Sequence, residues 1–152
     1  MNKLLLRIGG IANIMVGLLH VAIAIIGPWG YRFFGAGEEF AQADEAGALY
    51  PAVVTVCLAV VFVVFGIYAC CPKIGRWRFP LRRFALWAIA VIYLLRGAAA
   101  LVQGYQMAIG EPILMRNLIF SLVALGIGVC YLMGVLGLGK AENDAVRSAV
   151  GG

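Results

Sequence analysis

The chain has 152 residues, of which 64% are hydrophobic and only 12% are charged. Soluble domains carry about 25% charged residues, and a surface that faces water cannot be built from so apolar a chain. The composition therefore excludes an ordinary soluble domain and favours a membrane protein that folds as one compact unit. The formal net charge of +5 does not indicate nucleic-acid binding, because the basic residues flank apolar runs and do not share a polar face.

Four long apolar runs cover about residues 4–26, 50–71, 84–106 and 118–138. At 1.5 Å per residue, roughly 20 helical residues cross a hydrocarbon layer of about 30 Å. A single run in lipid must satisfy its own backbone hydrogen bonds, so each run is expected to be an α-helix. The sequence thus predicts an all-α fold, an up-down-up-down four-helix transmembrane bundle that forms a single membrane domain over residues 1–152.

The first connection, 27–49, is the longest and the most acidic one. It carries Glu38, Glu39, Asp44 and Glu45 against a single base, Arg32. Its GEEFAQADEAG segment is expected to form a short helix on the membrane surface, although its glycines weaken it. The aromatic residues of the preceding WGYRFF segment suit the belt that membrane proteins place at the interface.

The other connections set the orientation of the chain. The segment 72–83 carries five basic residues and no acid, and lysine and arginine concentrate in cytoplasmic connections. Both termini and the basic loop 72–83 are therefore predicted to be cytoplasmic, and the acidic loop 27–49 with the 109–116 turn to be periplasmic or external. The tail 140–152 is predicted to be flexible. The first run follows basic residues, as in a signal peptide, but its length and polar residues favour a retained span.

Arg96 is the central charge of the third run, and none of the four spans contains Asp or Glu. A charge at this depth costs about 2.5–3.5 kcal/mol on insertion scales. One interpretation is that Arg96 snorkels to the outer headgroups or bonds backbone carbonyls. The other is that Arg96 faces the bundle interior and holds a lipid phosphate, a quinone head or a loop carboxylate. Glu38 and Glu39 are the preferred candidates for that loop counter-charge.

Helical spacing places further polar side chains with Arg96. Gln103 follows it by seven residues and Tyr93 precedes it by three, so the three share a face. Because alternate runs reverse direction, polar residues of all four runs are expected at one depth in the outer leaflet. The alternative is that these groups only bond neighbouring helices, at about 0.6 kcal/mol each. The candidate ligand-binding residues are Arg96, His20, Gln103, Thr55, Ser121, Tyr93 and Asn13.

The sequence predicts no catalytic residues and no metal site. The spans lack the carboxylate that proton-coupled carriers use. The single histidine has no partners for a zinc site, and the four cysteines include no CxxC pair and are expected to be small packing residues. Glycines in the first and fourth runs allow close helix packing within the chain or across a homodimer.

The opening LLRIGGIANIMVGLLHV, the four-run layout and the IYLLRG text of the third run resemble small bacterial inner-membrane proteins of the DoxX-like type. The resemblance implies a multi-pass protein of the inner (plasma) membrane that faces lipid or quinone. Some members of that group are linked to quinol oxidation or redox homeostasis.

The resulting functional hypothesis is a small integral membrane protein of accessory or structural type, not itself an enzyme. Its outer-leaflet pocket around Arg96 would bind a lipid headgroup or a quinone, and no cofactor is required. The expected partners are membrane lipids, a second copy or a larger membrane complex, and no nucleic acid. One alternative is a quinone-linked redox subunit that binds between His20 and Arg96. A second is a small dimeric transporter, which the lack of an intramembrane carboxylate disfavours.

Overall fold

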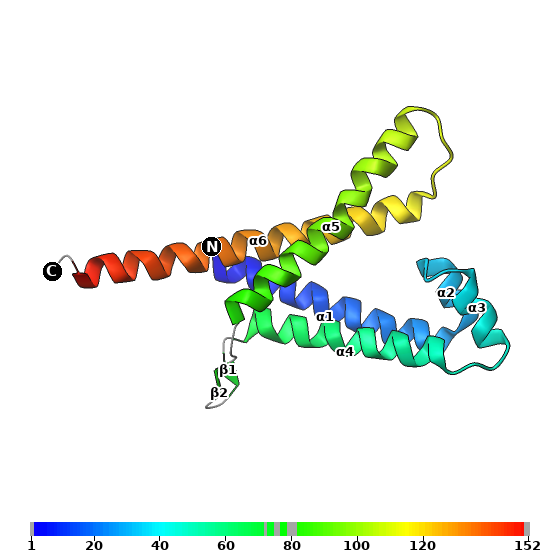
Figure 1. Ribbon diagram of the computed structural model, residues 1–152, viewed down its shortest axis with the longest axis horizontal. Helices are drawn as coiled ribbons and strands as arrows, with labels where there is room; N and C mark the ends of the chain where they lie inside the picture. Colours follow the sequence, from blue (N-terminus) through cyan, green and yellow to red (C-terminus); the bar gives the residue numbers. More distant parts are fainter. Residues whose placement is uncertain (1, 72, 75–76, 79–81, 151–152) are drawn as a thin grey trace. The chain divides into compact units, whose positions relative to one another are not determined.

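The computed structural model describes residues 2–71, 73–74, 77–78 and 82–150. These residues form six α-helices and one pair of two-residue strands (Figure 1). In chain order the elements are α1 (Asn2–Ile26), α2 (Pro28–Phe34), α3 (Glu38–Glu45), α4 (Tyr50–Cys70), β1 (Lys73–Ile74), β2 (Trp77–Arg78), α5 (Arg82–Ala108) and α6 (Met115–Val150).

Four of the described helices are long and apolar enough to cross a membrane. The qualifying segments are Lys3–Ile26, Tyr50–Cys70, Arg82–Ala108 and Met115–Lys140, and each matches one of the predicted apolar runs to within a few residues. This confirms the prediction of a helical chain with four candidate spans. Insertion in the membrane, the direction of each span and the four-helix bundle stay predictions.

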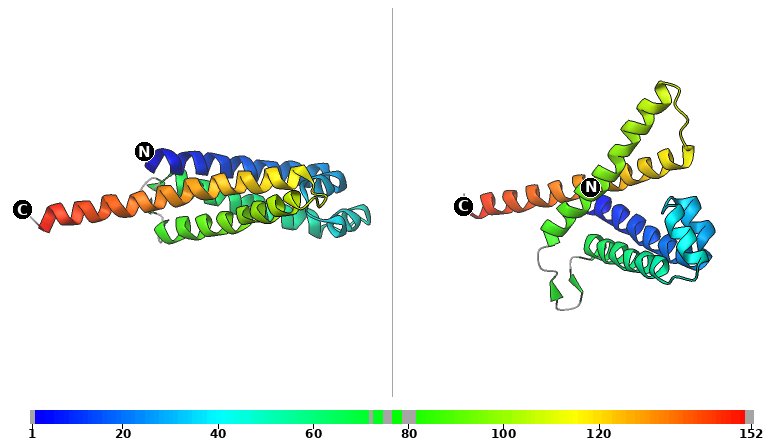
Figure 2. Two further views of the ribbon diagram at one scale, coloured as in Figure 1. Left: turned by 90° about the horizontal axis from the view of Figure 1, so that it is seen from above. Right: turned by 45° about the vertical axis from the view of Figure 1, so that its right-hand side comes forward.

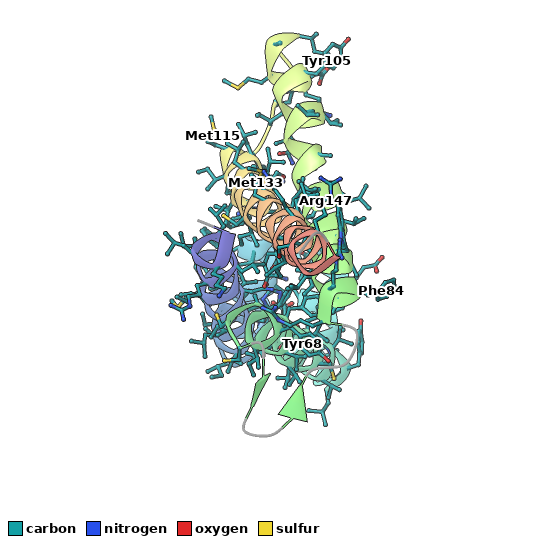
Figure 3. The ribbon with its side chains drawn as sticks, turned by 90° about the vertical axis from the view of Figure 1, so that its left-hand side faces the viewer. Tyr68, Phe84, Tyr105, Met115, Met133 and Arg147 are labelled. Atoms are coloured by element: carbon teal, nitrogen blue, oxygen red, sulfur yellow. The ribbon has the colours of Figure 1, made fainter. Side chains whose placement is uncertain are left out.

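Large apolar side chains cover much of the outer surface of these helices. On α5 and α6, Phe84, Tyr105, Met115 and Met133 point away from the ribbon (Figure 3) and are 48% to 72% exposed. Water solvates so extensive an apolar surface poorly. The hydrocarbon chains of a bilayer solvate it well. The exposure pattern therefore agrees with spans that face hydrocarbon.

The chain forms two compact units. The first consists of residues 1–10 and 68–152, and the second of residues 11–67. In the first unit, α5 and α6 form an antiparallel hairpin whose helices cross and then diverge toward the 109–114 turn (Figure 1 and the right-hand view of Figure 2).

Two glycines allow the backbones of α5 and α6 to touch where the helices cross. A methyl group on Gly97 would lie 2.6 Å from Cα of Leu125, and one on Gly128 would lie 2.9 Å from the backbone nitrogen of Leu94. The buried face of α5 repeats every three or four residues, which is the spacing of one helix face. Its members are Leu86, Ile89, Ala90, Tyr93, Gly97 and Ala100.

In the second unit, α1 packs closely on α4 and the first connection forms two short helices. A methyl group on Gly17 would lie 3.0 Å from the carbonyl oxygen of Ala59. Gly27, at φ 74°, separates α1 from α2, because a left-handed residue ends the helix there. A small core at this end consists of Ile23, Tyr31 and Ala41, with Phe34 and Phe40 packed against them.

The connections differ from the predictions in three details. The expected short helix in GEEFAQADEAG is present as α3, but the aromatic WGYRFF segment, expected only as an interfacial belt, is also helical as α2. The helix α6 continues to Val150, so residues 141–150 are helical where we predicted a flexible tail; that flexibility stays a prediction. Within the basic connection, β1 pairs with β2 in antiparallel register, and residues 72, 75–76 and 79–81 lie outside the described residues.

Candidate functional site

Arg96 is anchored to α6 by a single side-chain hydrogen bond. Its Nη1 donates to Oγ of Ser121 at 2.9 Å. Ser121 is completely buried, whereas the rest of the Arg96 side chain is exposed on the protein surface. A guanidinium carries five N–H donors, so this bond fixes the position of the group and leaves most of its donors available. Within its own unit, Arg96 has no carboxylate partner among the described residues.

The crossing of α5 and α6 creates this contact. Gly97 touches Leu125 across the interface, which brings the neighbouring Arg96 to the edge of α6. Ser121 lies one helical turn before Leu125 and therefore on the same face of α6. The small serine side chain leaves room for the guanidinium, and the fold thus joins two of the seven predicted ligand-binding residues.

Gln103 extends the polar face of α5 toward the 109–114 turn. It follows Arg96 by seven residues, which is about 10 Å along the helix axis. Its Oε1 is buried and has no hydrogen-bond partner among the described residues. An unsatisfied buried acceptor costs about 1–3 kcal/mol. Gln103 therefore presents an acceptor that a donor group on a bound molecule would satisfy.

Tyr93, in contrast, belongs to the packed interface of the hairpin. Its side chain is buried, and its ring stacks on Tyr131 of α6 with centroids 6.4 Å apart and planes 5° apart. A methyl group on Gly9 of α1 would touch the Tyr131 ring at 3.0 Å. We therefore interpret Tyr93 as a core residue that holds the helices together and not as a lining residue of a site.

The remaining predicted site residues lie in the second unit. Nδ1 of His20 donates to the carbonyl oxygen of Val16 at 2.8 Å, which leaves Nε2 as the acceptor of a neutral ring. The Thr55 hydroxyl donates to the carbonyl oxygen of Pro51 at 2.7 Å, so its proton is used within its own helix. Asn13 is completely buried. The grouping of these three with Arg96 in one pocket stays a prediction.

The acidic connection contains an ion-pair cluster that the sequence analysis missed. Nε and Nη2 of Arg32 donate to the two carboxylate oxygens of Glu38 at 2.9 and 2.8 Å. The same guanidinium donates to both oxygens of Glu45, at 2.7 and 3.2 Å. The hydrogen bonds from Arg32 lower the pKa of both glutamates. We call this set, Arg32 with Glu38 and Glu45, the Arg32 clasp, and it ties α2 to α3.

The Arg32 clasp changes the assignment of the loop carboxylates. We predicted Glu38 as a counter-charge for Arg96, but both of its oxygens accept hydrogen bonds from Arg32. Glu39 is exposed and takes no part in the clasp. Its pairing with Arg96 stays a prediction. Arg32 is the only base among the acids of this connection, and this signal was noted but not used to pair it with them.

Metal ligands do not gather in the part of the chain that the structure describes. There, no three His, Cys, Asp or Glu side chains lie close enough to hold a metal ion. The thiols of Cys57, Cys70, Cys71 and Cys130 are free.

Comparison with known proteins does not narrow the function. No protein-family model, no curated protein and no solved structure matches this chain. The resemblance to the DoxX-like group therefore stays a prediction from the residues that suggested it, and any functional conclusion has to come from the geometry of the site.

Proposed function

We propose that the protein is a small multi-pass membrane protein of accessory type, in which Arg96 holds an oxygen-bearing group supplied by the membrane. The phosphate of a phospholipid is the preferred ligand, and the carbonyl group of a quinone is the second. The observation that supports this proposal is the Arg96–Ser121 hydrogen bond at 2.9 Å. It fixes one nitrogen of the guanidinium in a helix that is apolar enough to span a membrane.

A neutral hydroxyl orients Arg96 but does not compensate its charge. A cation at this depth costs about 2.5–3.5 kcal/mol on insertion scales. The planar guanidinium can give two parallel hydrogen bonds to a phosphate, and such bonds are about twice as strong as neutral ones. A quinone carbonyl would accept a bond but bring no charge. The balance of charge therefore favours the lipid phosphate.

The buried Oε1 of Gln103 supports a ligand that also carries a donor. It lies on the same face of α5 and has no partner among the described residues. A hydroxyl or ammonium group of a headgroup would satisfy this acceptor while the phosphate engages Arg96. In this proposal the termini are cytoplasmic and the site opens toward the outer leaflet of the inner membrane, as the charge distribution and the DoxX-like resemblance predict.

The test is the amount of ligand that the purified protein retains. The full chain would be purified in mild detergent and washed, and bound phospholipid and extracted quinone would be measured per chain. We expect Arg96→Ala to lower the affinity for the ligand held at Arg96 about tenfold or more, and so to remove that ligand during washing, since a hydrogen bond to a charged group contributes about 1.5–3 kcal/mol. Arg96→Lys keeps the positive charge but loses the planar group that can give two parallel hydrogen bonds. It should therefore retain an intermediate amount of ligand.

Arg147→Ala is the matched control, because it removes an exposed arginine of α6 that lies outside the candidate spans. It should retain as much ligand as the unmodified protein. Equal retention by Arg96→Ala and Arg147→Ala would contradict the proposal. Loss of quinone without loss of phospholipid in Arg96→Ala would instead identify the second ligand.

A further inference from the structure

A cavity of about 340 Å³ lies in the first unit, where α1 and α5 begin and α4 ends. Three basic side chains, Lys3, Arg7 and Arg82, line it. No acidic side chain belongs to its lining among the described residues. Three like charges around one hollow repel one another, so the cavity is suited to an anion.

Arg82 shapes the cavity by binding the end of α4. Its Nε donates to the carbonyl oxygen of Tyr68 at 2.9 Å, and its Nη2 donates to that of Ala69 at 3.2 Å. These carbonyls lie in the last turn of α4, where no later residue of the helix can donate to them. The two bonds hold the guanidinium in place, but their acceptors are neutral. The charge of Arg82 therefore remains available to a ligand.

Apart from the thiol of Cys70, the rest of the lining is apolar. Leu6 and Ala69 are each 2% exposed and Leu138 is half-buried, and together they form a hydrocarbon wall beside the three cations. A ligand that fits both parts must carry a negative group and an attached apolar part. A free phosphate ion would leave the apolar wall in contact with water. A phospholipid provides both the negative group and the apolar part.

We propose that this cavity binds the phosphate of an anionic membrane phospholipid, with the start of an acyl chain against Leu6, Ala69 and Leu138. The candidate spans begin at Lys3 and Arg82 and end at Cys70, so the cavity lies at the level where a bilayer places its headgroups. Basic pockets between membrane helices recognise anionic headgroups in this way. The positive ends of the α1 and α5 dipoles lie at the same end, and Arg82 binds the last carbonyl oxygens at the negative end of α4.

The connection that follows α4 does not supply the missing anion. Residues 72–81 carry Lys73, Arg76 and Arg78 and no acid. By sequence alone, this segment offers no carboxylate for a site that already holds three cations. A negatively charged ligand from outside the chain is therefore the better complement.

The experiment compares the thermal unfolding of the delipidated full chain in detergent with three additives: phosphatidylglycerol, phosphatidylcholine and sodium phosphate. We expect phosphatidylglycerol to raise the melting temperature saturably, and the other two to have little effect at equal concentration. Arg7→Gln and Lys3→Gln should each weaken the apparent affinity for phosphatidylglycerol about fivefold, the effect of one charge near a membrane surface. Arg7→Lys should restore most of the affinity, which shows that a loss in Arg7→Gln is not due to misfolding.

Arg147→Gln removes the same charge from an exposed position of α6 that does not line the cavity, and it should leave the affinity unchanged. An equal loss in Arg147→Gln and Arg7→Gln would overturn the proposal, because attraction would then depend on overall charge only. An equal response to phosphatidylcholine would overturn it as well. If sodium phosphate alone reproduced the full shift, the cavity would bind soluble phosphate and the lipid assignment would be wrong.

This inference is separate from the function proposed for Arg96. Arg96 follows Arg82 by 14 residues on α5, which is about 21 Å along the helix. The Arg96→Ala variant should therefore keep its full response to phosphatidylglycerol, while Arg7→Gln should keep the ligand held at Arg96. A loss of the phosphatidylglycerol response in Arg96→Ala would contradict the presence of two independent sites.

Discussion

Arg32 and Arg96 are two arginines of one chain whose charges meet different surroundings. Arg32 lies in the connection between α1 and α4 and is held by two carboxylates, those of Glu38 and Glu45. Arg96 lies in the middle of α5, where its Nη1 donates to the hydroxyl oxygen of Ser121. The charge of Arg32 is neutralised by carboxylates of its own unit. Arg96 is held in position by a hydroxyl of its own unit, which does not neutralise its charge.

The difference shows where a ligand should be sought. The side chains of the Arg32 clasp are 39% to 56% exposed, and exposed ion pairs contribute little to stability because water screens them. A charge within a candidate membrane span is not screened in this way, so its compensation matters far more. The predictions below test this contrast between the clasp and the α5–α6 hairpin.

The largest expected effect is that of Gly97→Ala at the crossing of α5 and α6. The added methyl group would lie 2.6 Å from Cα of Leu125, a backbone atom that cannot rotate away. We expect the two helices to be forced apart and the free energy of unfolding to fall by about 3 kcal/mol, near the upper end for overpacking. Thermal or denaturant unfolding in detergent would measure this loss.

Gly104→Ala on the same helix is the matched control. A methyl group on Gly104 meets no described atom within 4 Å, and alanine is a better helix former than glycine by about 0.5–1 kcal/mol. It should therefore be neutral or slightly stabilising. If both variants unfolded alike, the close approach at Gly97 would not hold the hairpin, and the position of Arg96 would need another explanation.

A smaller effect is expected from Ser121→Ala, which removes the anchor of Arg96. A hydrogen bond to a charged group contributes about 1.5–3 kcal/mol, and we expect a loss near the lower end because the guanidinium keeps other donors. Thr55→Val removes a hydroxyl that bonds only within its own helix and should cost about 0.5 kcal/mol or less. Equal effects of the two variants on unfolding would show that the Ser121 hydroxyl has no special role.

Much of the fold could be predicted because membrane spans depend on length and hydropathy. The four runs correspond within a few residues to the four candidate spans, which are α1, α4, α5 and the Met115–Lys140 part of α6, since a charged or polar stretch must end a span. The helix α2 was missed because an aromatic segment with a glycine suits both an interfacial belt and a short helix. It is helical because Tyr31 packs in the small core beside Ile23 and Ala41, a contact that local sequence does not reveal.

The site could be predicted only in part. Helical spacing shows which residues share a face of one helix, but it does not show which groups of other helices contact that face. Spacing placed Arg96, Gln103 and Tyr93 on one side of α5, and the structure separates them into an anchored cation, an unpartnered acceptor and a core ring. The pairing of Glu38 with Arg32 depends on the turn between α2 and α3. The basic cavity is lined by residues from the ends of three helices. A local sequence pattern cannot predict that these helix ends lie close together.

The smallest expected effect is the pH dependence of the Arg32 clasp. Hydrogen bonds from Arg32 hold the pKa of Glu38 and of Glu45 below the ordinary value of 4.5. Because the folded pKa is depressed, the stabilisation is fully present above pH 4.5 and is lost as the pH falls through the folded pKa values. Titration of the side-chain carboxyl carbons by NMR should therefore give midpoints below 4.5 for both glutamates.

Arg32→Gln should move both midpoints up toward 4.5, whereas Arg147→Gln should leave them in place. The stability of the α5–α6 hairpin should not follow this titration, because no carboxylate takes part in the Arg96–Ser121 contact. Midpoints that stayed low in Arg32→Gln would mean that another cation compensates the loop acids. Arg96 would then be the first candidate, and the contrast between the two arginines would be replaced by a direct link between them.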